Sequence, residues 1–535
     1  MQRLTIPSFL TDLAAEPRAI RALVAASAAI GAAGLNPTVF SPGYPSVQAA
    51  LRSEPDVEVL LLLATLIGAG LLFVGGVLSD SDGRRGILLG ALALLVVTGL
   101  LGLVATEGPI FLTGRLAGTA AANAVVPFAL ALVATMYHGI TRATAIGIVY
   151  AVYGGAVALA PVLVTLLGPG GSTWPAFAVA AAAAAVALWI AWGRTPDLPA
   201  MLRHERSYVV ATAVWAFAIV IVTSGIVGTG NGVNDPVRIA LIGIGAAMAT
   251  GYLVWARRRG GEPDAGHLHV ERRAVTIAVA VGLVIGFAQA GPLFQLTLFF
   301  RIVLHYGTLG ATLATAPFIV ALIVAGPVAG MLLVRYSPRA LISGGLAAVG
   351  VGNVVAALVL GPQAPYVVMA LSFALIGAGF VVTTTVRTAI IFASVPRGLP
   401  GTAAALNQAS VQVGSRIGLV VLTVVTTRLA LDAFGSSLGA VDPGQRDAAV
   451  AAFADVLKAI GTPAMGPISL TIAPNDLTAY SAAFTDALRQ ALLATGILTV
   501  AAAPIAWAML GRRDPLTTVW DHSDERTGSA SVFAG

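Results

Sequence analysis

Long apolar segments recur along the whole chain, and they constrain its fold more than any other feature. A helix needs about 20 consecutive apolar residues to cross the hydrocarbon core of a bilayer. We count fourteen such segments in the 535 residues. They begin near Ile20, Val57, Gly86, Ile110, Thr144, Trp174, Ser207, Val237, Ala274, Leu309, Ala340, Pro365, Gly401 and Ala487. The sequence therefore predicts an all-α integral membrane protein with fourteen transmembrane helices.

The composition excludes a soluble protein of this length. Only 10% of the residues are charged, whereas a soluble domain carries roughly 25%. The absence of cysteine excludes disulfides and thiol catalysis. All six histidines fall in predicted loops or at span ends, and there is no phosphate-binding Gly-Lys loop. We therefore expect the lipid bilayer as a partner, no metal, no cofactor and no enzymatic activity.

Basic residues are distributed unequally between alternate loops. An even number of spans puts both termini on one side, and that side then holds twenty of the 30 basic residues against seven opposite. The positive-inside rule predicts cytoplasmic termini, and it explains the net charge of +6 without a nucleic-acid partner. The use of 29 Arg against one Lys, with abundant Ala and Gly, favours a bacterial protein. We therefore expect a bacterial cytoplasmic membrane protein.

Polar linkers divide the spans into groups of six, two and six. The loop between the last two spans is long and contains a predicted amphipathic helix around 447–460. That helix is either a cap over the outer vestibule or a solvated surface helix without a role in transport. The predicted domains are an N-terminal six-helix bundle (1–193), two extra transmembrane helices with cytoplasmic linkers (194–272), a C-terminal six-helix bundle (273–510) that includes the outer loop 428–485, and a cytoplasmic tail (511–535).

The loop between the second and third spans carries the most specific motif. It reads Gly-Val-Leu-Ser-Asp-Ser-Asp-Gly-Arg-Arg, starting at Gly76 and ending at Arg85. Gly76 allows two helices to approach closely, and Gly83 permits a tight turn. Asp80 can accept hydrogen bonds from an arginine or from a helix N-terminus. Arg84 and Arg85 can anchor the loop at the anionic inner leaflet.

This loop resembles the cytoplasmic signature of the major facilitator superfamily, and the six-two-six arrangement resembles its fourteen-span drug:proton antiporter branch. The resemblance implies a substrate site near the bilayer midplane between two bundles. It implies that the loop latches the bundles together in the outward-facing state. It also implies secondary active export of amphipathic small molecules or drugs by alternating access. The implied latch residues are Gly76, Asp80, Gly83, Arg84 and Arg85.

Three arginines fall within predicted spans, where a charge is a functional-site hypothesis by default. Arg115, followed by small residues, resembles the family's fourth-span motif, in which the arginine faces the central cavity and is linked to proton movement. The alternative for Arg115 is a structural side chain that extends to an interface. Arg387 lies toward the cytoplasmic end of its span, which favours an interfacial anchor. Arg416 lies one turn beyond Val411, which occupies the usual arginine position of a thirteenth-span motif.

Three departures from the family pattern leave proton coupling, and protons as a partner, an open question. Asn36 stands where the first-span motif of the branch has an aspartate, and an amide cannot carry a proton. None of the 24 acidic residues lies near the middle of a predicted span. The fifth span, with Gly154 and Gly155 before Ala160-Pro161, matches the antiporter motif only in part. A lipid or glycolipid carrier without proton coupling, and a transport-inactive membrane scaffold, therefore remain alternatives.

Polar and aromatic residues at span positions that can face a cavity complete the predicted site. For many of them helix packing is an equally good interpretation, since polar residues also join membrane helices. Small-residue pairs, Gly86 with Gly90 and Gly326 with Gly330, allow close helix contact. The candidates for the substrate cavity or for coupling are Asn36, Arg115, Asn123, Tyr150, Tyr153, Gln289, Phe294, Gln295, Asn407, Gln412 and Arg416.

Overall fold

The protein is described by a computed structural model, and every regular element in the described residues is a helix, as the all-α prediction expects. The model describes residues 17–39, 84–104, 108–137, 139–167, 174–196, 236–258, 272–395, 400–437 and 474–510, with six more residues between 214 and 225. Ten helices in these ranges are long and apolar enough to cross a membrane. The predicted count of fourteen is not confirmed, because the span near Val57 lies outside these ranges and the span near Ser207 lies mostly outside them.

The described helices of the N-terminal half form one bundle. They are α2 (Pro17–Val39), α5 (Arg84–Val104), α6 (Gly108–Met136), α7 (Gly139–Leu167) and α8 (Trp174–Arg194). Helix α2 packs against α6, α7 and α8, while α5 packs against α6 and α8. Small side chains allow this contact: Ala26 and Ala29 of α2 are fully buried. A Cβ at Gly99 would lie 2.8 Å from that of Ala181, so α5 and α8 also approach closely.

The C-terminal half forms a second bundle. Its helices are α11 (Arg272–Ile302), α12 (Thr308–Ala314), α13 (Ala316–Leu332), α14 (Pro338–Val359), α15 (Tyr366–Ser394), α16 (Pro400–Ser437) and α18 (Pro474–Leu510). Extensive contacts join α11 to α16, and α14 to both α15 and α18. Gly350 and Gly496 let α14 and α18 nearly touch, since a Cβ at Gly350 would lie 2.7 Å from the Gly496 carbonyl oxygen. Phe300 and Phe373 pack in the core with tilted rings, whose centroids lie 5.9 Å apart.

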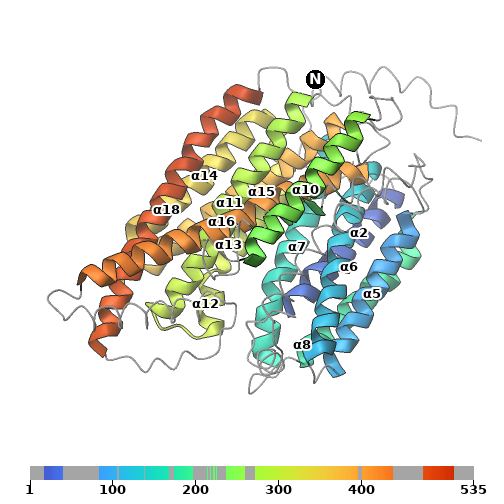
Figure 1. Ribbon diagram of the computed structural model, residues 1–535. Coiled ribbons are helices and arrows are strands. Elements are labelled where there is room, and N and C mark those ends of the chain that lie inside the picture. Colours follow the sequence, from blue (N-terminus) through green and yellow to red (C-terminus); the bar gives the residue numbers. More distant parts are fainter. Residues whose placement is uncertain are drawn as a thin grey trace, which may run out of the picture.

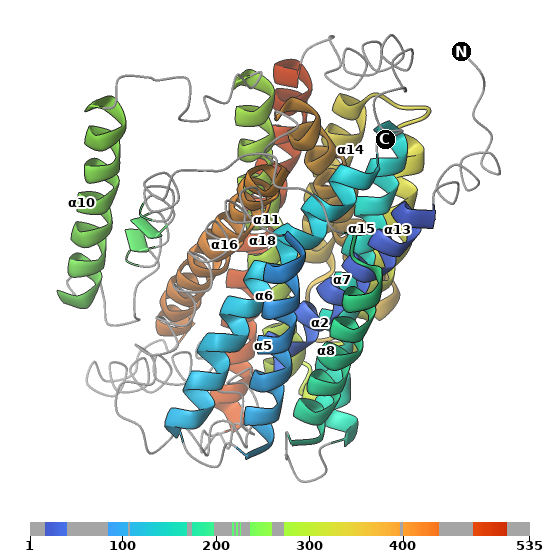
Figure 2. The ribbon, with the colours of Figure 1, turned by 90° about the vertical axis from the view of Figure 1, so that its right-hand side faces the viewer.

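The two bundles lie side by side, with helix α10 (Pro236–Arg258) outside them. Figure 1 shows the N-terminal helices in blue and teal beside the C-terminal helices in yellow to red. Figure 2 shows α10 separated from both bundles. Its Gly245 contacts Ala218 and Val222, which belong to the region of the preceding predicted span. Helix α10 therefore packs on its sequence neighbour and leaves the contact between the bundles to other helices.

Two element boundaries differ from the sequence prediction. The span expected from Leu309 is two helices, α12 and α13, which meet at Thr315. Pro317 in the first turn of α13 lacks an amide donor, so the helical ladder cannot run through it. The outer loop predicted over 428–485 is shorter, because helix α16 continues to Ser437 and helix α18 begins at Pro474. Its predicted amphipathic helix lies outside the described residues.

The bundles meet where α7 packs against α13 and α15, and where α6 packs against α16. We call this contact the seam. Its residues on the N-terminal side are Asn123, Thr144, Gly147, Tyr150 and Gly154, and those on the C-terminal side are Leu322, Gly326, Gly330, Thr388, Asn407 and Gln412.

Candidate functional site

Backbones of the two halves nearly touch where α7 crosses α13. A Cβ added at Gly326 would lie 2.6 Å from the carbonyl oxygen of Gly147, and a Cβ at Gly147 would overlap the carbonyl of Gly326. Gly330 meets Thr144 in the same way. Small residues allow this approach, as is common between membrane helices. Of the two predicted glycine pairs, Gly326 with Gly330 makes a close contact, while Gly86 and Gly90 have nothing within 4 Å.

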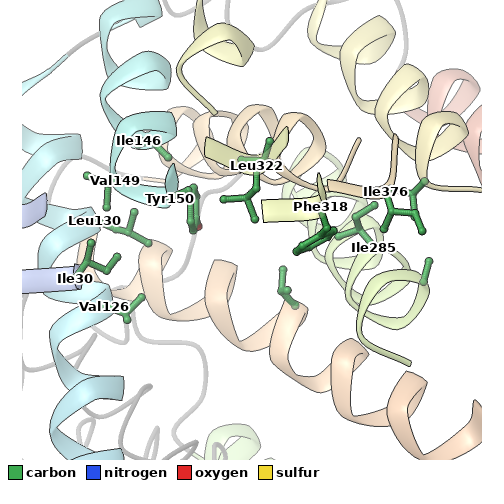
Figure 3. Close-up of a cluster of buried hydrophobic side chains, with 14 of the residues drawn as sticks. Ile30, Val126, Leu130, Ile146, Val149, Tyr150, Ile285, Phe318, Leu322 and Ile376 are labelled. Carbon is green, nitrogen blue, oxygen red and sulfur yellow. The ribbon is translucent and has the colours of Figure 1, made fainter. Parts of the chain in front are cut away.

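Apolar side chains continue the seam from the glycine crossing. Leu322 of α13 fills the space left by Gly154 of α7. Figure 3 shows Leu322 between Tyr150 of α7 and Phe318 of α13. All three side chains are buried. The seam therefore has an apolar section that excludes water from the polar groups beside it.

A hydrogen-bonded triangle of side chains joins three helices across the seam. The Asn407 amide nitrogen of α16 donates to the Tyr150 hydroxyl of α7 at 2.8 Å. The Thr388 hydroxyl of α15 lies 3.0 Å from Asn407 Oδ1 and 3.3 Å from the Tyr150 hydroxyl. All three residues are buried. Because Tyr150 belongs to one bundle and the other two residues to the second, relative movement of the bundles at this point must break the two bonds to Tyr150.

Arg387 lies directly behind this triangle, with 0% of its surface exposed. Its Nη1 donates to Ser410 Oγ at 2.7 Å and to the Ala278 carbonyl at 3.3 Å. Its Nη2 donates to the Asn407 carbonyl at 3.1 Å. Nε has no partner among the described residues. A Cβ at Gly282 would overlap Nη1, so the lack of a side chain there makes room for the guanidinium.

The prediction that Arg387 is an interfacial anchor is therefore wrong. Position along the helix suggested the anchor, but the side chain points into the bundle, where carbonyls of α11 and α16 accept its protons. The sequence feature that could have identified Arg387 as a buried residue is its position within a predicted span, where a charge is a functional-site hypothesis. Sequence reasoning also missed Thr388 and Ser410, because hydroxyl side chains in a membrane helix often bond only to their own backbone and so carry no pattern of a site.

A third hydrogen bond crosses the seam, between α6 and α16. The Gln412 amide nitrogen donates to Asn123 Oδ1 at 3.2 Å, and both side chains are half-buried. Both residues were cavity candidates, as were Tyr150 and Asn407. The structure thus brings four of the predicted residues together in pairs across the seam.

Other predicted residues lie within one bundle. Asn36 is fully buried, and its amide nitrogen lies 3.1 Å from the Leu95 carbonyl and 3.3 Å from Thr98 Oγ1, both in α5. Gln295 donates to Thr423 Oγ1 at 3.0 Å and so joins α11 to α16. These amides hold helices of the same half together.

The remaining candidates for the cavity lie on helices α6, α7, α11 and α16 and differ in burial. Tyr153 and Phe294 pack against the hydrophobic core while keeping part of their surface exposed. Gln289 is half-buried on α11, and Arg416 is half-buried on α16. Arg115 belongs to α6, but its side chain is outside the described part of the structure.

The predicted latch is represented here by Arg85 alone. Its Nη2 donates to the Trp192 carbonyl at 2.8 Å, which ties the start of α5 to the end of α8 within the N-terminal bundle. Gly76, Asp80 and Gly83 lie outside the described residues, and so does the side chain of Arg84. The contact of the latch with the other half is therefore not tested.

Sequence reasoning also missed a buried amide in the C-terminal bundle. Asn353 of α14 is fully buried, and its amide nitrogen donates to the Ala288 carbonyl of α11 at 3.0 Å. It was detectable as a lone amide in an otherwise apolar span.

Carboxylates are scarce in the described helices. They occur only in α16 and α18, at Asp432, Asp476 and Asp486. Asp432 lies near the end of α16, far along the helix from Asn407, and the other two lie in the first part of α18. Among the described residues, Arg387 therefore has neutral hydrogen-bond acceptors and no carboxylate partner.

Two helical bundles of apolar, membrane-length helices that meet at a buried seam of glycine contacts and neutral hydrogen bonds define a polytopic membrane protein. The model of the Major Facilitator Superfamily matches residues 26–419, and the chain belongs to that family. It is therefore a multi-pass membrane transporter, in a family whose members are transporters and not enzymes.

Relatives and solved structures agree with this assignment. A puromycin resistance protein from Streptomyces alboniger is 29% identical over 429 residues, which span 77% of this chain and 82% of the relative. A cephamycin export protein from Amycolatopsis lactamdurans is 29% identical over 432 residues, 76% of this chain and 85% of the relative. A solved proton:xylose symporter covers 94% of this chain and 99% of its own, with a TM-score of 0.55 and 15% identity. That likeness supports the fold alone.

Proposed function

We propose that this protein is a secondary active transporter that exports amphipathic small molecules from a bacterial cell by alternating access. The observation that carries the proposal is the seam, in which the described bonds between the halves are neutral and reversible. The relatives named for puromycin resistance and cephamycin export support the substrate class and the direction.

The charge distribution of the loops predicts that both termini are cytoplasmic, and this orientation would assign the seam to one side of the membrane. Tyr150 and Gly147 lie in the first half of α7, and Asn407 lies near the start of α16. Both helices begin on the cytoplasmic side in this orientation. The structure then represents a state closed toward the cytoplasm, with the triangle and the glycine crossing as the closure.

Opening the cytoplasmic side exchanges the seam bonds for bonds to water. A buried hydrogen bond contributes about 0.5 to 1.5 kcal/mol in net terms, so two or three of them hold the closure by only a few kcal/mol. A difference of that size can be reversed by ligand binding. The latch residues Gly76, Asp80, Gly83, Arg84 and Arg85 would add to the closure on the same side, while Arg115 would face the substrate path.

A second candidate function is an uncoupled carrier for lipids or glycolipids. Asn36 favours it, because this amide occupies the position of a proton-carrying aspartate and is used in helix packing. The lack of a carboxylate beside Arg387 in the described helices points the same way.

Efflux from cells that overproduce the protein tests both candidates. A panel of lipophilic dyes and antibiotics is measured with and without a protonophore, for the parent and for Arg115→Ala. Export by the parent that stops with the protonophore supports a coupled exporter, and export that persists supports the uncoupled carrier. No export of any compound would contradict the drug-export proposal. Parent-level export by Arg115→Ala, at equal protein amount, would remove Arg115 from the mechanism.

A further inference from the structure

The charge of Arg387 is stabilised less completely than its burial demands. A buried ion costs several kcal/mol unless it is paired with an opposite charge and its protons are all bonded. Arg387 is fully buried, and its described partners are two carbonyls and one hydroxyl. Its Nε is buried without a partner. The closed state therefore holds a cation with unused capacity for an anion.

Asn407 links this cation to the opposite bundle. The backbone carbonyl of Asn407 accepts from Arg387, while the Asn407 side chain donates to Tyr150 across the seam. Thr388, the next residue after Arg387, is in the same triangle. Separation of Tyr150 from Asn407 therefore uncovers the two residues, Asn407 and Thr388, that lie next to Arg387.

The chemistry of arginine selects the kind of anion that fits. The guanidinium is planar, stays charged, and presents parallel N–H groups that match the two oxygens of a carboxylate. A carboxylate would use the free Nε–H, which neutral partners leave unused, and would supply the missing negative charge. A neutral ester of the same molecule offers neither.

We propose that Arg387 binds the carboxylate of an amphipathic substrate when the cytoplasmic side opens. The proposal rests on the proposed export function and specifies its substrate class. In the closed state Asn407, Thr388 and Tyr150 cover the site. In the open state the carboxylate takes the place next to Nε, and its departure toward the outer side lets the triangle form again.

Binding and efflux of a matched dye pair test this proposal. Rhodamine B carries a free carboxylate, and its ethyl ester has the same ring system without it. Binding of each dye to the purified full-length protein is measured by fluorescence anisotropy, and efflux is measured in cells. A charge-assisted bond contributes about 1.5 to 3 kcal/mol, so we expect the parent to prefer the carboxylate dye by about tenfold or more.

Variants then assign the preference to one side chain. Arg387→Gln is expected to bind both dyes equally, and Arg387→Lys to keep part of the preference, because it keeps the charge without the planar fork. Arg489→Gln is the matched control, since Arg489 donates to the Leu360 carbonyl away from the seam. It is expected to keep the full preference.

The outcomes separate this proposal from the export function. Binding and export of both dyes by the parent without preference would overturn the carboxylate site and leave the export function standing. A preference retained in folded Arg387→Gln would overturn the role of Arg387. If inorganic phosphate displaces the carboxylate dye as well as unlabelled carboxylate dye does, the site binds anions in general, and its assignment to substrate is overturned. If the parent neither binds nor exports either dye, the result counts against the export function itself. If Arg387→Gln does not fold, the comparison of the parent with Arg387→Lys still tests whether the preference for the carboxylate dye depends on this side chain.

Discussion

Asn36 and Asn407 are both fully buried amides, but they have different partners and therefore different consequences. Asn36 donates to a backbone carbonyl and to Thr98 within one bundle, and its Oδ1 has no partner among the described residues. Asn353 repeats this arrangement in the other bundle, where it donates to the Ala288 carbonyl. Asn407 instead uses both ends of its amide in the triangle with Thr388 and Tyr150.

The difference indicates which polar groups move during transport. Bonds within a bundle persist if each bundle moves as a rigid body, so Asn36 and Asn353 contribute to stability in every state. Bonds across the seam exist only when the halves are together. Substitutions within a bundle should therefore change stability, and substitutions at the seam should change the balance of states.

The glycine crossing provides the strongest test of the seam. A valine at position 147 would overlap the Gly326 carbonyl, so Gly147→Val should prevent closure. Overpacking costs about 1 to 3 kcal/mol, and we expect export to fall about tenfold or more. Gly86→Val is the control, because that position has nothing within 4 Å. Equal export by Gly147→Val and the parent, per folded molecule, would show that closure here is not part of the cycle.

The triangle should give the next largest effect. Asn407→Ala removes its bonds to Tyr150 and Thr388 and should shift the protein toward the cytoplasm-open state by about 1 to 2 kcal/mol. The sequence has no cysteine, so a single Thr144→Cys reports opening through its rate of maleimide labelling. We expect labelling several-fold faster in the Asn407→Ala background. An unchanged rate would exclude the triangle as a closure.

The amides within the bundles should show the opposite behaviour. Asn36→Ala removes the bond to the Leu95 carbonyl, and Asn353→Ala removes the bond to the Ala288 carbonyl, so each should lower stability by about 1 kcal/mol. Thermal unfolding of the purified protein measures the loss. Export per folded molecule should stay at the parent level. A strong loss of export by Asn36→Ala without loss of stability would return Asn36 to the substrate path.

The smallest effect is expected at the far end of the C-terminal bundle. Arg489 donates to the Leu360 carbonyl at 2.7 Å and so caps the end of α14. Arg489→Gln should lower stability by about 0.5 to 1 kcal/mol, because a cation near a helix C-terminus is mildly stabilising. Thermal unfolding checks this, and labelling at Thr144→Cys should not change.

Sequence reasoning predicted the all-helical membrane fold and identified Tyr150, Asn407, Asn123 and Gln412 as polar candidates in otherwise apolar spans. It left open whether each faced a cavity or another helix. Periodicity locates a residue along a helix, but the apolar faces toward lipid and toward protein have similar composition. The burial of Arg387 was missed for this reason, since counting from the end of α15 suggested the interface.

The sequence alone determined that the chain crosses the membrane many times, because repeated runs of about 20 apolar residues are stable in the hydrocarbon core of a bilayer and not in water. It also determined that charge inside those spans is scarce and confined to arginine. The tertiary structure decided which polar groups meet. Tyr150 and Asn407 are 257 residues apart, and their contact depends on how two separately packed bundles dock through Gly147 and Gly326. The same docking determines that Arg387 is buried next to the seam.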